Sequence, residues 1–214
     1  TLVDGFPVEI NEKVLRGAAV ADLDGNNKVD IVVATESDDL VIAIYDNGDY
    51  DVLFDGTEKF KSSPSIAKVN GEFIVFIGSD DDHFYGINLD GEIQININTG
   101  DKIRTSAGFI NDSNGLTIFT ASQDGYLYGI DYSGNMREGW PVNVGMSLII
   151  DPIIADVNGD GINDILVGDN TGQLLAYHLN GEIVDGFPIQ SGYSFSGSML
   201  ADDIDNDGDI DIAI

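Results

Sequence analysis

Cysteine is absent from the 214-residue chain, which excludes disulfide bonds and thiolate metal sites. Basic residues are scarce as well: 9 lysines and arginines stand against 38 aspartates and glutamates, which gives a net charge of −29 at pH 7. A surface of this charge repels nucleic acid and anionic lipid, so neither is expected as a partner. The apolar runs are no longer than a β-strand, so no membrane-spanning segment is predicted.

Helical periodicity is also missing, because no segment of ten or more residues repeats its apolar positions as a helix does. Short runs of Ile, Val, Leu and aromatic residues instead alternate with Gly, Asn and Asp, as strands alternate with turns. Hydrophobic residues make up 43% of the chain, which at this length allows a sizeable core. The chain is therefore expected to be an all-β globular protein.

An internal repeat organises these strands. The segments AAVADL, SIAKV, AGFIN, IIADV and MLADDI are related, and each leads into a loop or turn. The first residues of these loops, separated by 46, 43, 45 and 47 residues, are Asp22, Lys68, Asn111, Asp156 and Asp203. A second marker, DGFP or EGWP, agrees with this period near 45 residues. Its aromatic residues are Phe6, Trp140 and Phe187.

Each repeat is predicted to hold four antiparallel strands. Its third and fourth strands are joined by two-residue turns that end in glycine, which tolerates the positive φ of a tight hairpin. These turns are Asn47-Gly48, Asp90-Gly91, Ser133-Gly134 and Asn180-Gly181. Small residues recur in the third strand, where neighbouring sheets are expected to approach closely. They are Ala43, Gly86, Gly129 and Ala176.

Four antiparallel strands in about 45 residues are typical of a β-propeller blade. The predicted fold class is therefore all-β, with one β-propeller domain over residues 1–214. Its parts are a partial blade at 1–10, whole blades at 11–56, 57–101, 102–145 and 146–190, and a partial blade at 191–214. A closed propeller usually needs more blades, so the chain is expected to be a window of a longer one. The repeated aromatic residues are expected to pack between blades, with sugar stacking as the alternative.

Three loops crowd oxygen donors together: DLDGNNKVD (22–30), DVNGDGIND (156–164) and DIDNDGDID (203–211). Positions 1, 3, 5 and 9 carry oxygen side chains, and position 7 would offer its backbone carbonyl. Calcium takes about six to eight oxygens, and alternate residues of a curled loop converge on one point. The sequence therefore predicts up to three Ca²⁺ sites. Their ligands are Asp22, Asp24, Asn26, Lys28 and Asp30; Asp156, Asn158, Asp160, Ile162 and Asp164; and Asp203, Asp205, Asp207, Asp209 and Asp211.

Other metal sites fit these loops less well. An EF-hand needs a glutamate at position 12, where this chain has Val33, Val167 and Ile214 within strands. Magnesium rarely uses an all-protein cage, and zinc would need cysteine or paired histidine. The remaining alternative is that Asp, Asn and Gly simply make good turns. Three loops that share both spacing and repeat register argue against it.

The five loops are not expected to be equal. Loop 22–30 should bind calcium most weakly, because Asn26 is neutral and Asn27 replaces glycine at position 6. In the second and third repeats the corresponding segments are KVNGEF (68–73) and NDSNGL (111–116). These are predicted to be shortened turns that bind no calcium.

The loops and their flanking strands form a longer motif: a small-residue strand, Asp-x-Asp-x-Asp-Gly-x-x-Asp, and an apolar strand. IIADVNGDGINDILVG (153–168) and MLADDIDNDGDIDIAI (199–214) match it, and GAAVADLDGNNKVDIVVA (17–34) matches apart from Asn26 and Asn27. With this motif the chain resembles the FG-GAP/VCBS repeat family, which includes the integrin α-chain head. The resemblance implies a seven- or eight-bladed propeller in which calcium is structural. SQDGYLYGIDYSGN (122–135) is similar to quinoprotein-type repeats; the similarity concerns blade geometry and does not imply a quinone cofactor.

Two functions follow from this reading. The first is an extracellular or cell-surface module, stabilised by calcium, that recognises a glycan or protein ligand in adhesion or binding. The second is part of a calcium-dependent polysaccharide lyase or related enzyme; a spacer in a large surface protein is a third. A lyase needs a base in a cleft and basic residues to hold an acidic polymer, and the 9 present are scattered, which disfavours catalysis. Loops that bind at about 10⁻⁴–10⁻³ M would fill only outside a cell.

The two histidines give little support to catalysis. His83 follows three aspartates, Asp80 to Asp82, in a pattern that looks like a metal site. Alignment with SQDGY (122–126) instead predicts a turn between the second and third strands. His178 is predicted to end the third strand of its blade, just before the turn at Asn180.

Overall fold

The computed structural model describes residues 5–195 and 197–214, and these residues form 18 β-strands and no helix. The chain divides into two compact units, Thr1–Ser106 and Ala107–Ile214. Four sheets have four strands each, joined in the order in which they follow along the chain, and a fifth has two. The predicted all-β class and the four-stranded antiparallel repeat are confirmed. A single domain over residues 1–214 stays a prediction.

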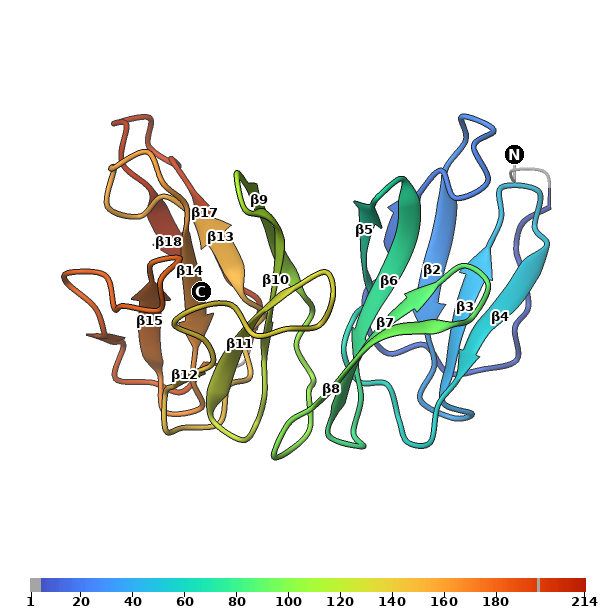
Figure 1. Ribbon diagram of the computed structural model, residues 1–214, viewed down its shortest axis with the longest axis horizontal. Coiled ribbons are helices and arrows are strands. Elements are labelled where there is room, and N and C mark those ends of the chain that lie inside the picture. Colours follow the sequence, from blue (N-terminus) through green and yellow to red (C-terminus); the bar gives the residue numbers. More distant parts are fainter. Residues whose placement is uncertain (1–4, 196) are drawn as a thin grey trace. The chain divides into compact units, whose positions relative to one another are not determined.

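The amino-terminal unit contains two of the four-stranded sheets, drawn in blue to green in Figure 1. The first consists of β1 (Ala19–Ala21), β2 (Asp30–Ala34), β3 (Leu40–Ile44) and β4 (Tyr50–Asp55). The second consists of β5 (Ser65–Val69), β6 (Glu72–Gly78), β7 (His83–Asn88) and β8 (Ile93–Asn98). Every pairing within them is antiparallel, so tight turns suffice to join the strands.

The carboxy-terminal unit repeats this arrangement twice and begins it a third time. Its sheets are β9 (Gly108–Asp112), β10 (Gly115–Ala121), β11 (Tyr126–Asp131) and β12 (Val142–Asn143); β13 (Ile153–Ala155), β14 (Asp164–Gly168), β15 (Gln173–Tyr177) and β16 (Ile189–Gln190); and the pair β17 (Leu200–Asp202) and β18 (Asp211–Ala213). The fourth strands β12 and β16 are shorter than the sequence suggests. EGWP and DGFP form turns there, because Gly139 and Gly186 adopt φ of 87° and 92° and proline has no N–H to donate.

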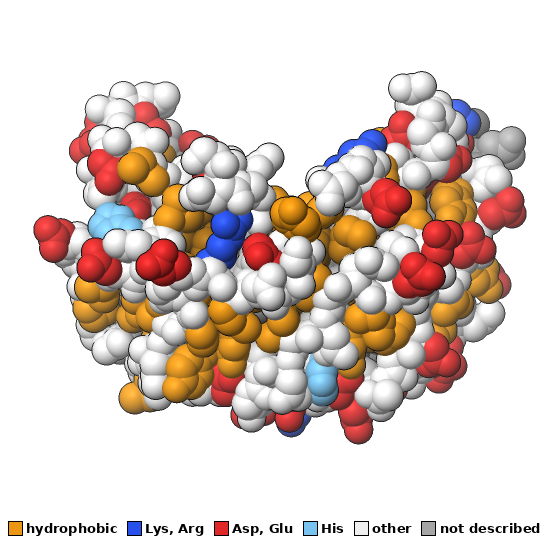
Figure 2. Space-filling view, in the orientation of Figure 1, with side chains coloured by type: hydrophobic (Ala, Val, Ile, Leu, Met, Phe, Trp, Pro, Cys, Tyr) orange, Lys and Arg blue, Asp and Glu red, His pale blue; other side chains and the backbone are white. Residues whose placement is uncertain are grey.

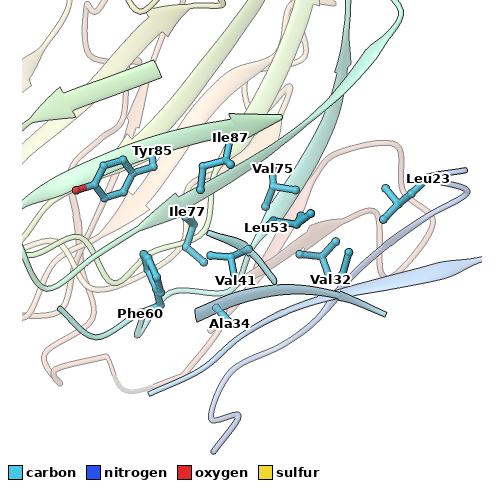
Figure 3. Close-up of a cluster of buried hydrophobic side chains, with 11 residues drawn as sticks. Leu23, Val32, Ala34, Val41, Leu53, Phe60, Val75, Ile77, Tyr85 and Ile87 are labelled. Atoms are coloured by element: carbon cyan, nitrogen blue, oxygen red, sulfur yellow. The ribbon is translucent and has the colours of Figure 1, made fainter. Parts of the chain in front are cut away.

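The core of the amino-terminal unit lies between its two sheets. Val32 and Val41 of the first sheet meet Val75 and Ile87 of the second, and all four side chains are fully buried (Figure 3). Phe60, from the segment between the sheets, completes this cluster. Each such side chain contributes about 1.5–3 kcal/mol through removal of its apolar surface from water. Nearly every position of β2, β3, β6 and β7 is buried, and this shared apolar cluster holds the two sheets face to face.

The carboxy-terminal unit has two corresponding cores. One joins β10 and β11 to β14 and β15, through residues such as Leu127 and Val167. The other joins β14 and β15 to the β17–β18 pair, through Leu166 and Met199 among others, with Phe187 packed against it. The β13–β16 sheet thus packs one face on the sheet before it and the other on the pair after it.

Trp140 connects two neighbouring sheets of this unit. Its side chain is buried, and its indole Nε1–H donates a 2.9 Å hydrogen bond to the backbone carbonyl of Leu179 in the next repeat. The ring also covers Gly129, where an added Cβ would lie 2.7 Å from the indole and 3.0 Å from Phe119. A small residue at this third-strand position was expected to allow the close approach of a neighbouring sheet. The structure shows that it admits the ring of Trp140 from its own repeat.

The turn from Asp80 to Asp82 is held by ion pairs. The carboxylate of Asp80 accepts hydrogen bonds from Arg104 Nε at 2.7 Å and Nη2 at 2.9 Å, and Lys61 Nζ lies 3.0 Å away. Burial acts to raise the pKa of the Asp80 carboxyl, but the hydrogen bonds from Arg104 and Lys61 outweigh it and hold that pKa below its usual value. His83 is the first residue of β7, as the turn interpretation predicted.

Replacement of Gly129 by alanine should destabilise the protein. The added methyl group has no room between the indole of Trp140 and the ring of Phe119, and overpacking of this kind costs about 1–3 kcal/mol. Urea unfolding followed by tryptophan fluorescence measures the change. Gly197→Ala serves as the control, because no heavy atom lies within 4 Å of its added Cβ. Equal stability of Gly129→Ala and the original protein would contradict the packing of Trp140 described above.

Replacement of Arg104 by alanine should cost about 1.5–3 kcal/mol at pH 7, the range for hydrogen bonds to charged groups. The pKa of the Asp80 carboxyl is lower in the folded protein than in the unfolded chain, where it is about 3.9. The ion pair therefore stabilises the folded protein fully at pH values above the unfolded pKa, and this stabilisation is lost as pH falls through the folded pKa. Urea unfolding at pH 7 and pH 3 tests this. Lys13→Ala, which breaks an exposed pair with Glu36, should change stability by under about 1 kcal/mol at either pH.

Candidate metal sites

The three acidic loops occupy equivalent places in their repeats. Loop 1 (residues 22–30) joins β1 to β2, loop 2 (156–164) joins β13 to β14, and loop 3 (203–211) joins β17 to β18. Each therefore connects the first strand of a repeat to the second, as predicted. Within the carboxy-terminal unit, loops 2 and 3 project from the same end of their sheets (Figure 1).

All three loops share one scheme of hydrogen bonds. The carboxylate at position 1 accepts the backbone N–H of position 6, the oxygen at position 3 accepts that of position 5, and the oxygen at position 5 accepts that of position 7. Side-chain oxygens are thereby drawn back over the loop's own backbone. The bonds to position 1 run from Asn27 to Asp22 (2.9 Å), from Gly161 to Asp156 (2.7 Å) and from Gly208 to Asp203 (3.1 Å).

The aspartate at position 9 closes each loop. It is the first residue of the second strand, and its Oδ2 accepts the backbone N–H of position 2. Asp30 receives this bond from Leu23 at 2.8 Å, and Asp164 and Asp211 receive theirs at 3.3 and 3.1 Å. Asp30 and Asp164 are fully buried. A buried carboxylate needs such partners, so position 9 fixes the start of the loop against its end.

The carboxylates at positions 1, 3 and 9 converge in two loops. One ligand oxygen from each of Asp22, Asp24 and Asp30 lies within 4.8 Å of the others, and loop 3 brings Asp203, Asp205 and Asp211 equally close. Loop 2 has Asn158 at position 3, so it cannot form the same group of three carboxylates. Asp160 and Asp207, at position 5, belong to no such group within the described residues.

Loop 1 also contains a carboxylate oxygen without a partner. Asp22 Oδ1 is buried and accepts no hydrogen bond within the described part of the chain, although Oδ2 of the same group is bonded to Asn27. A buried unpaired carboxylate oxygen beside two other carboxylates is unfavourable unless a cation offsets the charge. The donor set is all oxygen, which suits a hard cation such as Ca²⁺. The residues of loop 1 therefore fit the predicted ion.

Two further side chains bear on loop 1. Asp46, at the end of the β3–β4 hairpin, accepts Asn26 Nδ2 at 2.7 Å and forms an ion pair with Lys28. Asn26 thus turns its amide N–H toward Asp46 and Asp24, while its carbonyl oxygen accepts the N–H of Lys28 at 2.8 Å. Sequence reasoning gave Asn26 and Lys28 to the ligand set but missed Asp46. Nothing in the local spacing indicates a contact made across 18 to 20 residues.

His178 supports loop 2. Its Nδ1 lies 2.8 Å from Oδ1 of the buried Asp164, so both oxygens of this position-9 carboxylate have partners. Burial raises the pKa of the Asp164 carboxyl, and the contact with His178 only partly opposes that rise. In loop 1 the backbone N–H of Asp46 bonds Asp30 Oδ1 at 3.0 Å in the same way. His178 was predicted to end the third strand but lies one residue beyond β15, and its link to a predicted metal ligand was not foreseen.

Position 4 of each loop was missed by the sequence reasoning, although the signal was present. Every loop adopts positive φ at position 6, as predicted, and at position 4 as well. The residues at position 4 are Gly25 (φ 79°), Gly159 (φ 74°) and Asn206 (φ 64°). Only glycine or asparagine stands there, and these are the residues that tolerate a left-handed conformation. No heavy atom lies within 4 Å of a Cβ added to the glycines, so φ and not space restricts the position.

The shortened turns of the second and third repeats are confirmed. β5 and β6 are joined by Asn70 and Gly71, with φ of 52° and 94°, and Val69 pairs with Glu72. β9 and β10 pair from Asp112 to Gly115, which leaves two residues in the turn. Neither turn has room for the nine-residue loop.

Basic side chains are concentrated in the amino-terminal unit. Eight of the nine lysines and arginines precede Ala107, and Arg137 alone follows it. Arg137 Nη2 donates to the backbone carbonyls of Asn114 and Leu116, both at 3.1 Å. Aspartate and glutamate side chains are spread over the face in Figure 2, with few lysines or arginines between them. None of the described residues forms a helix that could cross a membrane.

Sequence comparisons identify no relative, since neither a protein-family model nor a curated protein matches. Solved structures match in fold. The computationally designed Ika8 protein gives a TM-score of 0.62 at 14% identity, over 91% of this chain and 56% of that one. BBS1N in complex with ARL6DN gives 0.60 at 14%, over 86% and 58%. BamB from Moraxella catarrhalis gives 0.55 at 13%, over 81% and 51%.

The chain thus spans little more than half the length of these three structures. BamB and BBS1N are β-propellers. Together with the repeated four-stranded antiparallel sheets, this likeness shows that the fold is β-propeller-like.

Proposed function

We propose that the chain is part of a calcium-stabilised β-propeller that recognises a glycan or protein ligand outside the cell. Its four-stranded sheets are blades, and further blades complete the ring. The observation that carries the proposal is the convergence of three carboxylates at equivalent places in loops 1 and 3, with an unpartnered buried oxygen on Asp22. The resemblance to FG-GAP/VCBS repeats supports the same reading.

Calcium in these loops is structural. The carboxylates at positions 1, 3 and 9 hold it in loops 1 and 3, and Asp156, Asn158 and Asp164 stand at those positions in loop 2. The ion supplies positive charge that offsets the repulsion among the carboxylates. The chain's own part is done by backbone N–H groups, which orient the carboxylates before any ion arrives. A filled loop fixes the first strand of a repeat to the second.

Recognition is favoured over catalysis because the chain has only 9 lysines and arginines to hold an acidic polymer, and its two histidines make structural contacts. His178 is engaged with Asp164, and His83 contacts the carbonyl of Asp81 at 2.8 Å and Asn98 at 3.2 Å. Both ring nitrogens of His83 thus have partners, and Nδ1 of His178 is held by a carboxylate of loop 2, so both histidines take part in local structure. A propeller of similar fold, BBS1N, was crystallised in complex with ARL6DN, which supports a role in binding. An extracellular location agrees with loops of modest affinity, which fill only where calcium is abundant.

Calorimetric titration of the chelated protein with calcium should reveal up to three sites. Asp160→Ala and Asp207→Ala should each remove one, because each deletes the position-5 oxygen that orients its loop. Filling a site to 100 times its dissociation constant stabilises the fold by about 2.7 kcal/mol, so the melting temperature should rise with calcium. Asp112→Ala, at the last strand residue before a shortened turn, is the matched control and should remove no site. If calcium releases no heat and does not change the melting temperature, the loops are turns without a metal-binding role, and the proposal is wrong.

Asp22→Asn should have opposite effects with and without calcium. In a chelator, loss of one charge from the cluster relieves the repulsion among its carboxylates and should stabilise the protein by about 1 kcal/mol, the Coulomb energy of two unit charges about 4 Å apart in water. In saturating calcium the same change removes a ligand charge and should lower the melting temperature. Scanning calorimetry in both conditions measures the two signs. Asp49→Asn, outside the cluster, should change neither, and equal signs for Asp22→Asn would count against a cation in loop 1.

A further inference from the structure

A pocket of about 490 Å³ lies beside loop 1 in the amino-terminal unit. Its walls come from three elements: loop 1, the β5–β6 hairpin and the turn between β7 and β8. The volume falls in the range of roughly 300–1,000 Å³ that small-molecule sites occupy. None of the predicted metal ligands comes from the hairpin or the turn, so the pocket extends beyond the carboxylate cluster of loop 1, with which it shares Asp22 and Asp24.

The pocket contains several acidic side chains and one basic side chain. Four carboxylates line it, from Asp22 and Asp24 of loop 1, Glu72 of the hairpin and Asp90 of the turn. Lys68 is the single cation among them. The pocket therefore offers several hydrogen-bond acceptors around one strong donor.

Lys68 is held in place by an aromatic ring. Its Nζ lies 4.8 Å from the centroid of Phe73, and Phe73 itself packs against the core of this unit. No carboxylate of the described residues forms an ion pair with Lys68. The ammonium group thus has N–H bonds left to donate to a ligand.

The charges select the class of ligand. An anion would meet four carboxylates against one ammonium group. A cation would be attracted by the four carboxylates, but the ammonium group of Lys68 repels it and already covers the aromatic face of Phe73, so no cation–π position is left for it. A hydroxyl group suits both kinds of neighbour, because it donates to a carboxylate and accepts from an ammonium group.

We propose that this pocket binds a neutral saccharide through its hydroxyl groups. The hydroxyls donate to Glu72 and Asp90 and accept from Lys68. The inference rests on the proposed function and assigns its ligand class and its place. Asp22 and Asp24 belong both to the pocket wall and to the carboxylate cluster of loop 1, so calcium and saccharide binding are coupled. Saccharide hydroxyls are oxygen ligands of the kind that calcium accepts when a loop offers too few.

The experiment uses the whole chain on an array of neutral, acidic and amino-sugar glycans, with calcium and with chelator. Neutral glycans should be retained, and more strongly with calcium. NMR titration with the best neutral glycan then compares variants. Lys68→Met keeps the stem over Phe73 but removes the donor, and Asp90→Asn keeps the turn but removes the charge. Each should weaken binding about tenfold, the effect of one charge-assisted hydrogen bond.

Lys59→Met, outside the pocket, is the matched control and should bind as the original protein does. All three variants should keep the calcium-induced rise in melting temperature, since none alters the loops. Retention of acidic or amino-sugar glycans alone, or of none, would overturn the pocket assignment while the thermal shift upheld calcium binding. A different result would be glycan binding that depends on Lys68 while calcium leaves the melting temperature unchanged. That result would contradict the proposed calcium function and support the pocket assignment.

Discussion

Backbone N–H groups, more than lysine or arginine side chains, hold the carboxylates of this chain in place, and the repeat is built around that contact. With 38 acidic and 9 basic residues, the chain has too few basic side chains to pair one with each carboxylate. The fully buried Asp169 accepts the N–H groups of Thr171 and Gln173 at 2.8 and 2.9 Å. Each such bond satisfies a charged group and fixes a turn at once. An acidic sequence can therefore form tight antiparallel sheets without a matching set of basic residues.

Hydrogen bonds from backbone N–H groups to polar side chains recur at the same place in every whole repeat, and the repeats differ mainly at another connection. A fully buried polar residue directly follows each second strand of the four whole repeats, and its side chain accepts a backbone N–H from the next turn or from the first residue of the third strand. These residues are Thr35, Ser79, Ser122 and Asp169. The connection from the first strand to the second is less uniform, because it is a nine-residue acidic loop in some repeats and a two-residue turn in others. Variation at this one connection lets a constant scaffold carry different surfaces.

Loop 1 is where the proposed roles meet. Its carboxylates converge for a cation, Asp46 and Lys28 adjust its charge from outside, and two of its aspartates line the pocket beside the shortened β5–β6 hairpin. The hairpin matters as much as the loop, because a full acidic loop in the second repeat would place more carboxylates where Lys68 now stands. The pocket thus depends on the contrast between neighbouring repeats.

Local rules determined much of this protein from its sequence. Glycine and asparagine at positions of positive φ, the period near 45 residues and the spacing of oxygen donors depend only on near neighbours, so the four-stranded repeat, the acidic loops and the shortened turns could be predicted. Contacts made across many residues could not. Arg104 reaches Asp80 across 24 residues, and His178 reaches Asp164 across 14. The indole of Trp140 reaches Leu179 across 39. Their partners are chosen by sheet register and packing, which bring distant side chains together without leaving a periodic signal in the sequence.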